Sequence, residues 1–126
     1  MKKQFSVLLV GMILLAALAM PVPGSAGSEA FIHFIVVPAQ TQNRDELQSN
    51  LEAFKRMLAE TAGGYTSLGS TDGGALLPGG DIDKETSCSF IVASPQNISR
   101  EIEAWVETHF KTGKPFILVW KGESNF

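Results

Sequence analysis

The side chains with the widest chemical range in this chain are two histidines and one cysteine. His33 and His109 titrate near neutral pH when unperturbed, so each could act as an acid, a base or a metal ligand. Cys88 is the only cysteine, and no GxSxG motif presents a serine nucleophile. A zinc site needs three or four converging ligands, whereas these three residues are widely spaced. The residue types therefore indicate neither a catalytic constellation nor a zinc site.

The three residues have structural interpretations as well. Cys88 alternates with Phe90 and Val92, which favours a small hydrophobic residue of the core over a reactive thiol. His109 falls near the end of an apolar-periodic segment, as expected for a solvated histidine that the helix dipole stabilises. His33 lies within an apolar strand, so it faces either the covering helices or the open surface of the sheet, and a partly buried histidine at an interface between copies is the favoured interpretation.

A row of carboxylates is the weak candidate for a metal site. Asp81, Asp83 and Glu85 are spaced by two, which on an extended hairpin would point them to one side, where carbonyl oxygens could help to hold Ca²⁺. The spacing does not match the EF-hand loop. A solvated turn is the favoured interpretation, and no metal is assigned.

Three side chains are candidates for ligand binding. His33 would line a pocket if it faced the open surface of the sheet, and Tyr65 follows the glycine pair that ends a predicted helix. Trp120 ends the last predicted strand, beside Lys121, where an exposed indole would contact a ligand or a partner.

The first 26 residues read as a secretory signal peptide. Lys2 and Lys3 precede an apolar run over 5–20, which is broken by a segment rich in proline and glycine. We expect cleavage after Ala26, with cleavage after Ser28 as the alternative. The run is shorter than the roughly 20 residues of a membrane span, so no stable span is expected after cleavage. The sequence thus predicts a bacterial protein exported to the periplasm or beyond, with a single domain over 27–126.

The charge of the mature chain limits what it can bind, and its cysteine content limits how it can be stabilised. Removing Lys2 and Lys3 from the 10 basic residues leaves 8 against 13 acidic ones, a net charge of −5. An acidic domain without a basic cluster is unsuited to nucleic acid, which requires a row of cations to neutralise phosphates. A single cysteine forms no disulfide within its own chain, so stability must come from packing, with self-association as a further source.

Along the mature chain, segments with apolar residues at strand spacing alternate with segments that have them at helical spacing. Asn43 and Glu46 form a capping box at the start of one helix, which Gly63 ends, and Ser94 with Pro95 is predicted to start another, which ends at Gly113. The expected elements are a strand over 31–37, a helix over 43–62, an irregular edge strand or long hairpin over 65–84, a strand over 87–93, a helix over 95–112, a strand over 116–120 and a loose tail over 121–126.

This order predicts an α+β, ferredoxin-like βαββαβ sandwich of two layers, with both helices on one face of a four-stranded antiparallel sheet. The first and third strands should be central. Strand 31–37 is apolar on both sides, yet the helices cover only one of them. A homo-oligomer that covers the second side is therefore expected, packed face to face or as a ring.

The stretch GGYTSLG at 63–69 and the stretch DGGALLPGGDIDKETSCSFIV at 72–92 carry a resemblance. With the element order, they are similar to small exported bacterial proteins of the PII and CutA-like superfamily. The resemblance implies the ferredoxin-like fold. The nucleotide-binding loop and modified tyrosine of PII proteins have no counterpart here, so no ligand or residue role carries over. Ala75 stands where relatives commonly carry an aromatic residue.

Two hypotheses for the function follow. The first is an exported, non-catalytic binding or assembly module that is oligomeric and has an unknown protein or small-molecule ligand. The second is an enzyme or cofactor binder of the dimeric αβ-barrel type, with a sheet-face pocket around His33. The residues favour the first, and they identify no cofactor, substrate or partner.

Overall fold

The computed structural model describes residues 27–39, 43–111 and 113–125. The predicted signal peptide, 1–26, lies outside the described residues. The elements run in the order β1 (Ser28–Pro38), α2 (Arg44–Ala62), β2 (Thr66–Leu76), β3 (Ile82–Ser94), α3 (Ser99–His109) and β4 (Phe116–Ser124). The βαββαβ order is confirmed.

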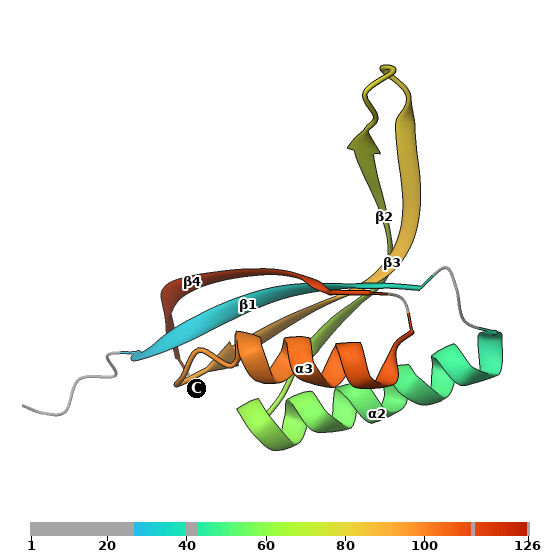
Figure 1. Cartoon of the computed structure of the whole chain (residues 1–126). Coiled ribbons are helices and arrows are strands. Elements are labelled where there is room, and N and C mark those ends of the chain that lie inside the picture. The colour runs from blue at the N-terminus through green and yellow to red at the C-terminus, as the bar shows by residue number, and fades with distance from the viewer. Residues whose placement is uncertain (1–26, 40–42, 112, 126) are drawn as a thin grey trace, which may run out of the picture.

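All strand pairs are antiparallel, and the sheet order is β2-β3-β1-β4. The first and third strands are therefore central, as predicted. In β1, Ile35 lies opposite Phe90 of β3 and Ile117 of β4. Both helices pack on the same side of the sheet (Figure 1). The molecule is thus the predicted ferredoxin-like sandwich of two layers.

Helix α2 has the boundaries that its sequence predicts. The Glu46 backbone N–H donates to the Asn43 side chain at 2.8 Å, which satisfies one free N–H of the first turn. At the other end, Gly63 has a φ of 86°, and its N–H donates to the Ala59 carbonyl. The helix buries Phe54 and Leu58 against the sheet.

Aromatic contacts centre the core on Phe54. Its ring centroid lies 5.2 Å from that of Phe90 on β3, 5.4 Å from Trp105 and 6.1 Å from Phe110. Helix α3 contributes Ile102 and Val106 to the same core. The two helices and the sheet therefore share one hydrophobic core, between the layers.

His33 is a buried imidazole on the helix side of β1. Its side chain has no exposed surface, and its Nε2 accepts the Ile98 backbone N–H at 3.1 Å. Because Nε2 accepts, the ring hydrogen must sit on Nδ1, which has no partner among the described residues. His33 thereby ties the middle of β1 to the start of α3.

Several boundaries differ from the prediction, and β1 and β3 start earlier than expected, at Ser28 and Ile82. Ser94 does not cap α3, because its side chain is buried and its backbone pairs with Phe31, so β3 continues through it. The helix starts at Ser99, whose N–H donates to the Asn97 side chain at 3.1 Å, and it ends at His109. The predicted loose tail is wrong for 121–124, since β4 pairs with β1 as far as Ser124 and Ser28.

The predicted long hairpin is present, and it extends beyond the sheet. The last pair between β1 and β3 joins Pro38 to Ser87, whereas β2 and β3 continue for five more pairs, from Asp72 and Thr86 to Leu76 and Ile82. Figure 1 shows this ribbon turning out of the sheet on the side away from the helices. We call residues 72–86 the arm.

Hydroxyl groups and a bulge fix the root of the arm. The Thr71 and Ser89 hydroxyls lie 2.7 Å apart, and Ser89 is buried. The register of β2 shifts between Ser67 and Gly69, and Gly69 has a φ of 77°, which a side chain would disfavour. The bulge increases the local twist and so accounts for the turn of the arm.

Neither helix among the described residues combines the length and the apolar character that a membrane crossing would require.

Replacing His33 by Ala tests the tie between β1 and α3. The change removes buried volume and leaves the Ile98 N–H without its acceptor, so we expect a loss of about 2–4 kcal/mol in the free energy of unfolding. Urea denaturation followed by circular dichroism measures this. Gln96→Ala, at an exposed position just before α3, should change stability little. Equal stability of the two variants would contradict the structural role of His33.

Candidate functional site

The structure places His33 on the helix side of the sheet. Its register partners there are Val92 and Val119, and Ile98 covers it from the start of α3. The second hypothesis requires this imidazole in a pocket on the opposite, open side. The side chain lies on the other face and has no exposed surface within one copy, so His33 occupies neither that pocket nor the expected partly buried position at an interface between copies.

The opposite side of the sheet gathers apolar side chains from β1, β3 and β4. Alternation along the strands places Ile32 beside Trp120, and Phe34 beside Leu118 and Ile91. We call this surface the open face. Its apolar members are Ile32, Phe34, Val36, Ile91, Phe116, Leu118 and Trp120.

Exposure on the open face increases towards the edge strand. Phe116, Leu118 and Trp120 of β4 are 56%, 49% and 48% exposed, whereas Ile32 and Phe34 of the central strand are partly buried by their neighbours. Large aromatic side chains have about 150–250 Å² to bury. The half-exposed rings of Phe116 and Trp120 alone therefore leave on the order of 200 Å² of apolar surface uncovered. Contiguous exposed apolar side chains of this kind are a common feature of interaction surfaces.

Tyr65 lies elsewhere, in a groove between α2 and the start of β2. The side chain is 40% exposed and makes an edge contact with the Phe90 ring, with centroids 6.4 Å apart. The groove has a volume of about 820 Å³, within the range of small-molecule sites. It is lined by Glu52, Ala53, Lys55, Arg56, Ala59, Glu60 and Tyr65.

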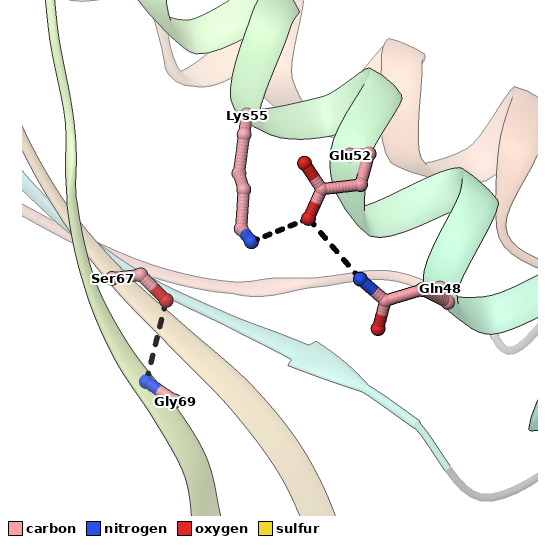
Figure 2. A network of polar contacts seen from close by, with 5 residues as sticks. All are labelled: Gln48, Glu52, Lys55, Ser67 and Gly69. Carbon is pink, nitrogen blue, oxygen red and sulfur yellow. Dashed lines mark hydrogen bonds and ion pairs between the residues drawn. The ribbon is translucent and has the colours of Figure 1, made fainter.

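The charges of this groove are already paired along α2. Figure 2 shows Glu52 between Lys55 and Gln48, and one carboxylate oxygen of Glu52 accepts from both, at 2.7 and 3.2 Å. The hydrogen bond to Glu52 raises the pKa of Lys55, against a smaller opposing effect of burial. Arg56 lies 3.7 Å from Glu60. The groove therefore combines a tyrosine with two ion pairs.

Cys88 is partly buried on the helix side of β3, opposite Val37. Burial raises the pKa of its thiol, and the nearby Lys55 ammonium partly opposes this shift. A raised pKa reduces the thiolate fraction at neutral pH, which is the reverse of what a nucleophile needs. The thiol packs against the core, in agreement with its interpretation as a small hydrophobic residue.

The carboxylate row lies on the arm. Asp81, Asp83 and Glu85 are all exposed, and Ala75 and Gly73 lie opposite the last two in the ladder. Within the described part of the chain, no three His, Cys, Asp or Glu side chains form a group that could hold a metal ion. The three carboxylates therefore do not form a metal site within one copy.

Sequence reasoning selected Trp120 but missed its two neighbours on the open face. Phe116 and Leu118 lie four and two residues before Trp120, so the period of a strand places all three on one side. The signal was present in the stretch FILVW. It did not show which of the two sides the helices would cover.

The reactivity of Cys88 provides a test of the groove electrostatics. We expect the rate of alkylation by iodoacetamide to reach half its maximum at a pH above that of an ordinary cysteine, because the buried thiol keeps its proton. Lys55→Gln removes a charge that favours the thiolate, so it should move the midpoint higher still. Arg56→Gln, on the adjacent residue of α2, is the matched control. A lower midpoint in Lys55→Gln would contradict this arrangement.

Comparison with known proteins identifies solved structures of the same fold. No protein-family model and no curated protein matches the chain. The periplasmic divalent cation tolerance protein CutA from Archaeoglobus fulgidus is 16% identical, with a TM-score of 0.52 over 79% of this chain and 88% of that one. CutA1 from Oryza sativa is 8% identical, with a TM-score of 0.56 over 79% and 85%.

A third structure agrees with these two. The divalent cation tolerance protein Cut A1 from Thermus thermophilus is 13% identical, with a TM-score of 0.52 over 74% of this chain and 82% of that one. Identities of this size show the fold alone. At that level the predicted resemblance is confirmed: the chain shares the fold of these CutA and CutA1 structures.

Proposed function

We propose that this protein is an exported, non-catalytic binding or assembly module that works as a homo-oligomer, joined through the open face. The observation that carries the proposal is the row of Phe116, Leu118 and Trp120, about half exposed on an edge strand and continuous with partly covered side chains of β1. No described element of the chain packs over it (Figure 1).

The energetics of burial support association. Fully burying a large apolar side chain stabilises by about 1.5–3 kcal/mol. Covering the exposed halves of three such side chains therefore contributes about 2–4 kcal/mol per copy. An edge strand with unpaired backbone groups beside the patch adds hydrogen bonds to a partner. A second copy of the chain supplies the same surface at equal concentration, which favours self-association.

Two observations favour a non-catalytic module over the αβ-barrel hypothesis. The first is the sealed position of His33, whose Nε2 is occupied by a backbone N–H at the start of α3. The second is Cys88, whose raised pKa leaves it a poor nucleophile. In the groove, the hydrogen bond to Glu52 raises the pKa of Lys55, which keeps this amine protonated and so disfavours it as a nucleophile.

The start of the fold is compatible with cleavage after Ala26. Gly27 approaches the end of β4 so closely that a Cβ there would lie 2.9 Å from the Ser124 carbonyl oxygen, and Ser28 forms the first pair of β1. Cleavage after Ser28 would remove this pair. Export also fits the structural relative from Archaeoglobus fulgidus, which is named as a periplasmic protein.

Two of the structural relatives are named for tolerance to divalent cations. For this chain, cation handling is a hypothesis without a site of its own, because the described residues of one copy hold no cluster of three suitable ligands. Self-association through the open face does not depend on a metal.

Leu118→Lys tests the proposal. A charge in the middle of the exposed row on β4 should convert the oligomer to a monomer, because the ammonium would be buried without a partner. Native mass spectrometry of the protein recovered from the cell envelope reports subunit number, retained ligand and the first residue together. We expect a chain that starts at Gly27.

Ala104→Lys places the same charge on α3, on the far side of the molecule from the open face, and should keep the oligomer. Circular dichroism shows whether both variants fold. A wild-type protein that stays monomeric at micromolar concentration would exclude the proposed mode of action, and a chain that starts at Glu29 would exclude cleavage after Ala26.

A further inference from the structure

The hydrogen bond between β1 and the start of α3 uses the nitrogen that an added proton would occupy. His33 Nε2 accepts the Ile98 backbone N–H at 3.1 Å. A neutral imidazole has one acceptor nitrogen, whereas an imidazolium donates from both nitrogens and accepts at neither. A proton on Nε2 would therefore point at the Ile98 N–H. Protonation of His33 and this hydrogen bond exclude each other.

The surroundings of His33 suit a neutral ring. The side chain has no exposed surface, and its register partners, Val92 of β3 and Val119 of β4, are aliphatic. Every Asp and Glu side chain in the described part of the chain is exposed or only partly buried, so none shares the buried position of the imidazole. A buried charge without a partner is costly. The site therefore disfavours the imidazolium while the start of α3 is in place.

A cation, and not a carboxylate, is the charged group that the strand register places nearest to His33. Lys121 of β4 lies on the same side of the sheet, two residues beyond the partner of His33, and its positive charge opposes a second one there. The other charged or titratable groups of the surrounding elements are the exposed Arg100 and Glu101 of α3, Cys88 of β3 with the nearby Lys55 of α2, and Glu29 and Glu123, paired at the outer ends of β1 and β4.

His109 shows the opposite arrangement. It is exposed at the end of α3, and its Nδ1 donates to the Trp105 carbonyl at 2.8 Å. This bond uses a donor nitrogen, so it remains when the ring takes up a second proton. A cation is also favourable at the C-terminus of a helix. Of the two histidines in the chain, His33 is therefore the one that couples proton uptake to the loss of a contact.

The contact at Ile98 fixes the connection between β3 and α3, residues 95–98. Ile98 is the N-cap residue of α3, where no side-chain hydrogen bond caps the helix, and its own side chain belongs to the core. Its carbonyl accepts the Ile102 N–H at 3.0 Å, which closes the first turn. Without His33 as acceptor, the buried Ile98 N–H is costly to leave unpaired. The connection therefore has to open until water reaches this N–H.

We propose that the contact between His33 and Ile98 is a pH-sensitive switch: proton uptake at Nε2 breaks the bond and releases the start of α3 from β1. An unfolded or opened chain takes up this proton at about pH 6.5, as an ordinary histidine does. The closed contact excludes it. The open states therefore bind more protons, and stability falls as the pH falls through this range. The switch acts within one copy, so it is independent of the proposed self-association.

Urea denaturation at about pH 7.5 and about pH 5, at one protein concentration, tests the switch. His33→Gln supplies an oxygen that accepts the Ile98 N–H and does not titrate. Relative to this variant, the folded-to-unfolded ratio of the wild type should fall about tenfold between the two pH values, with a limit of about 30-fold for one histidine. His109→Gln is the matched control and should keep the wild-type pH dependence. Equal pH dependence in the wild type and His33→Gln would overturn the inference.

Hydrogen exchange at the Ile98 amide provides a second measurement, which needs no variant and so remains decisive if His33→Gln does not fold. In the ¹⁵N-labelled wild type, the protection of this amide, corrected for the intrinsic exchange rate, should also fall about tenfold between the two pH values. Unchanged protection would overturn the switch. Subunit number is a separate outcome, because a monomeric wild type would exclude the proposed function and leave the switch intact.

Discussion

The pairing of β1 with β3 on one side and β4 on the other is the constraint on which the rest of the structure depends. This central strand is apolar at every position from Phe31 to Val37 except His33, so both of its sides have to be removed from water. The right-handed crossovers put α2 and α3 on one side only. The other side becomes the open face, and the arm is the one part of the described chain that projects beyond it.

The helix side shows how a polar residue is accommodated in such a strand. His33 lies among aliphatic and aromatic neighbours, and the Ile98 N–H satisfies its Nε2. That bond also positions the start of α3, where Ile98 has no side-chain oxygen to act as a cap. The imidazole thus has a structural role at a position where the residue type alone suggested chemistry.

The open face and the arm are both left uncovered by the rest of the described chain. Phe116, Leu118 and Trp120 leave apolar area uncovered, and the arm leaves a two-stranded ribbon uncovered. Each would be a liability in a monomer, since exposed patches and free edges favour nonspecific aggregation. The groove near Tyr65 shows the contrast, because its Lys55 and Arg56 are already paired within α2.

Periodicity and turn residues are local properties, so the element order, the capped helix from Asn43 to Gly63, the fold class and the long hairpin could all be predicted from the sequence. Tertiary structure alone decided which side of β1 was covered, and therefore that His33 is sealed while Trp120 is exposed. Pairing with β1 also extended β4 to Ser124 and kept Ser94 in β3, and α3 starts at Ser99 instead of the predicted Pro95. A strand repeats every two residues, so a sequence separates its two sides without saying which one the helices will cover.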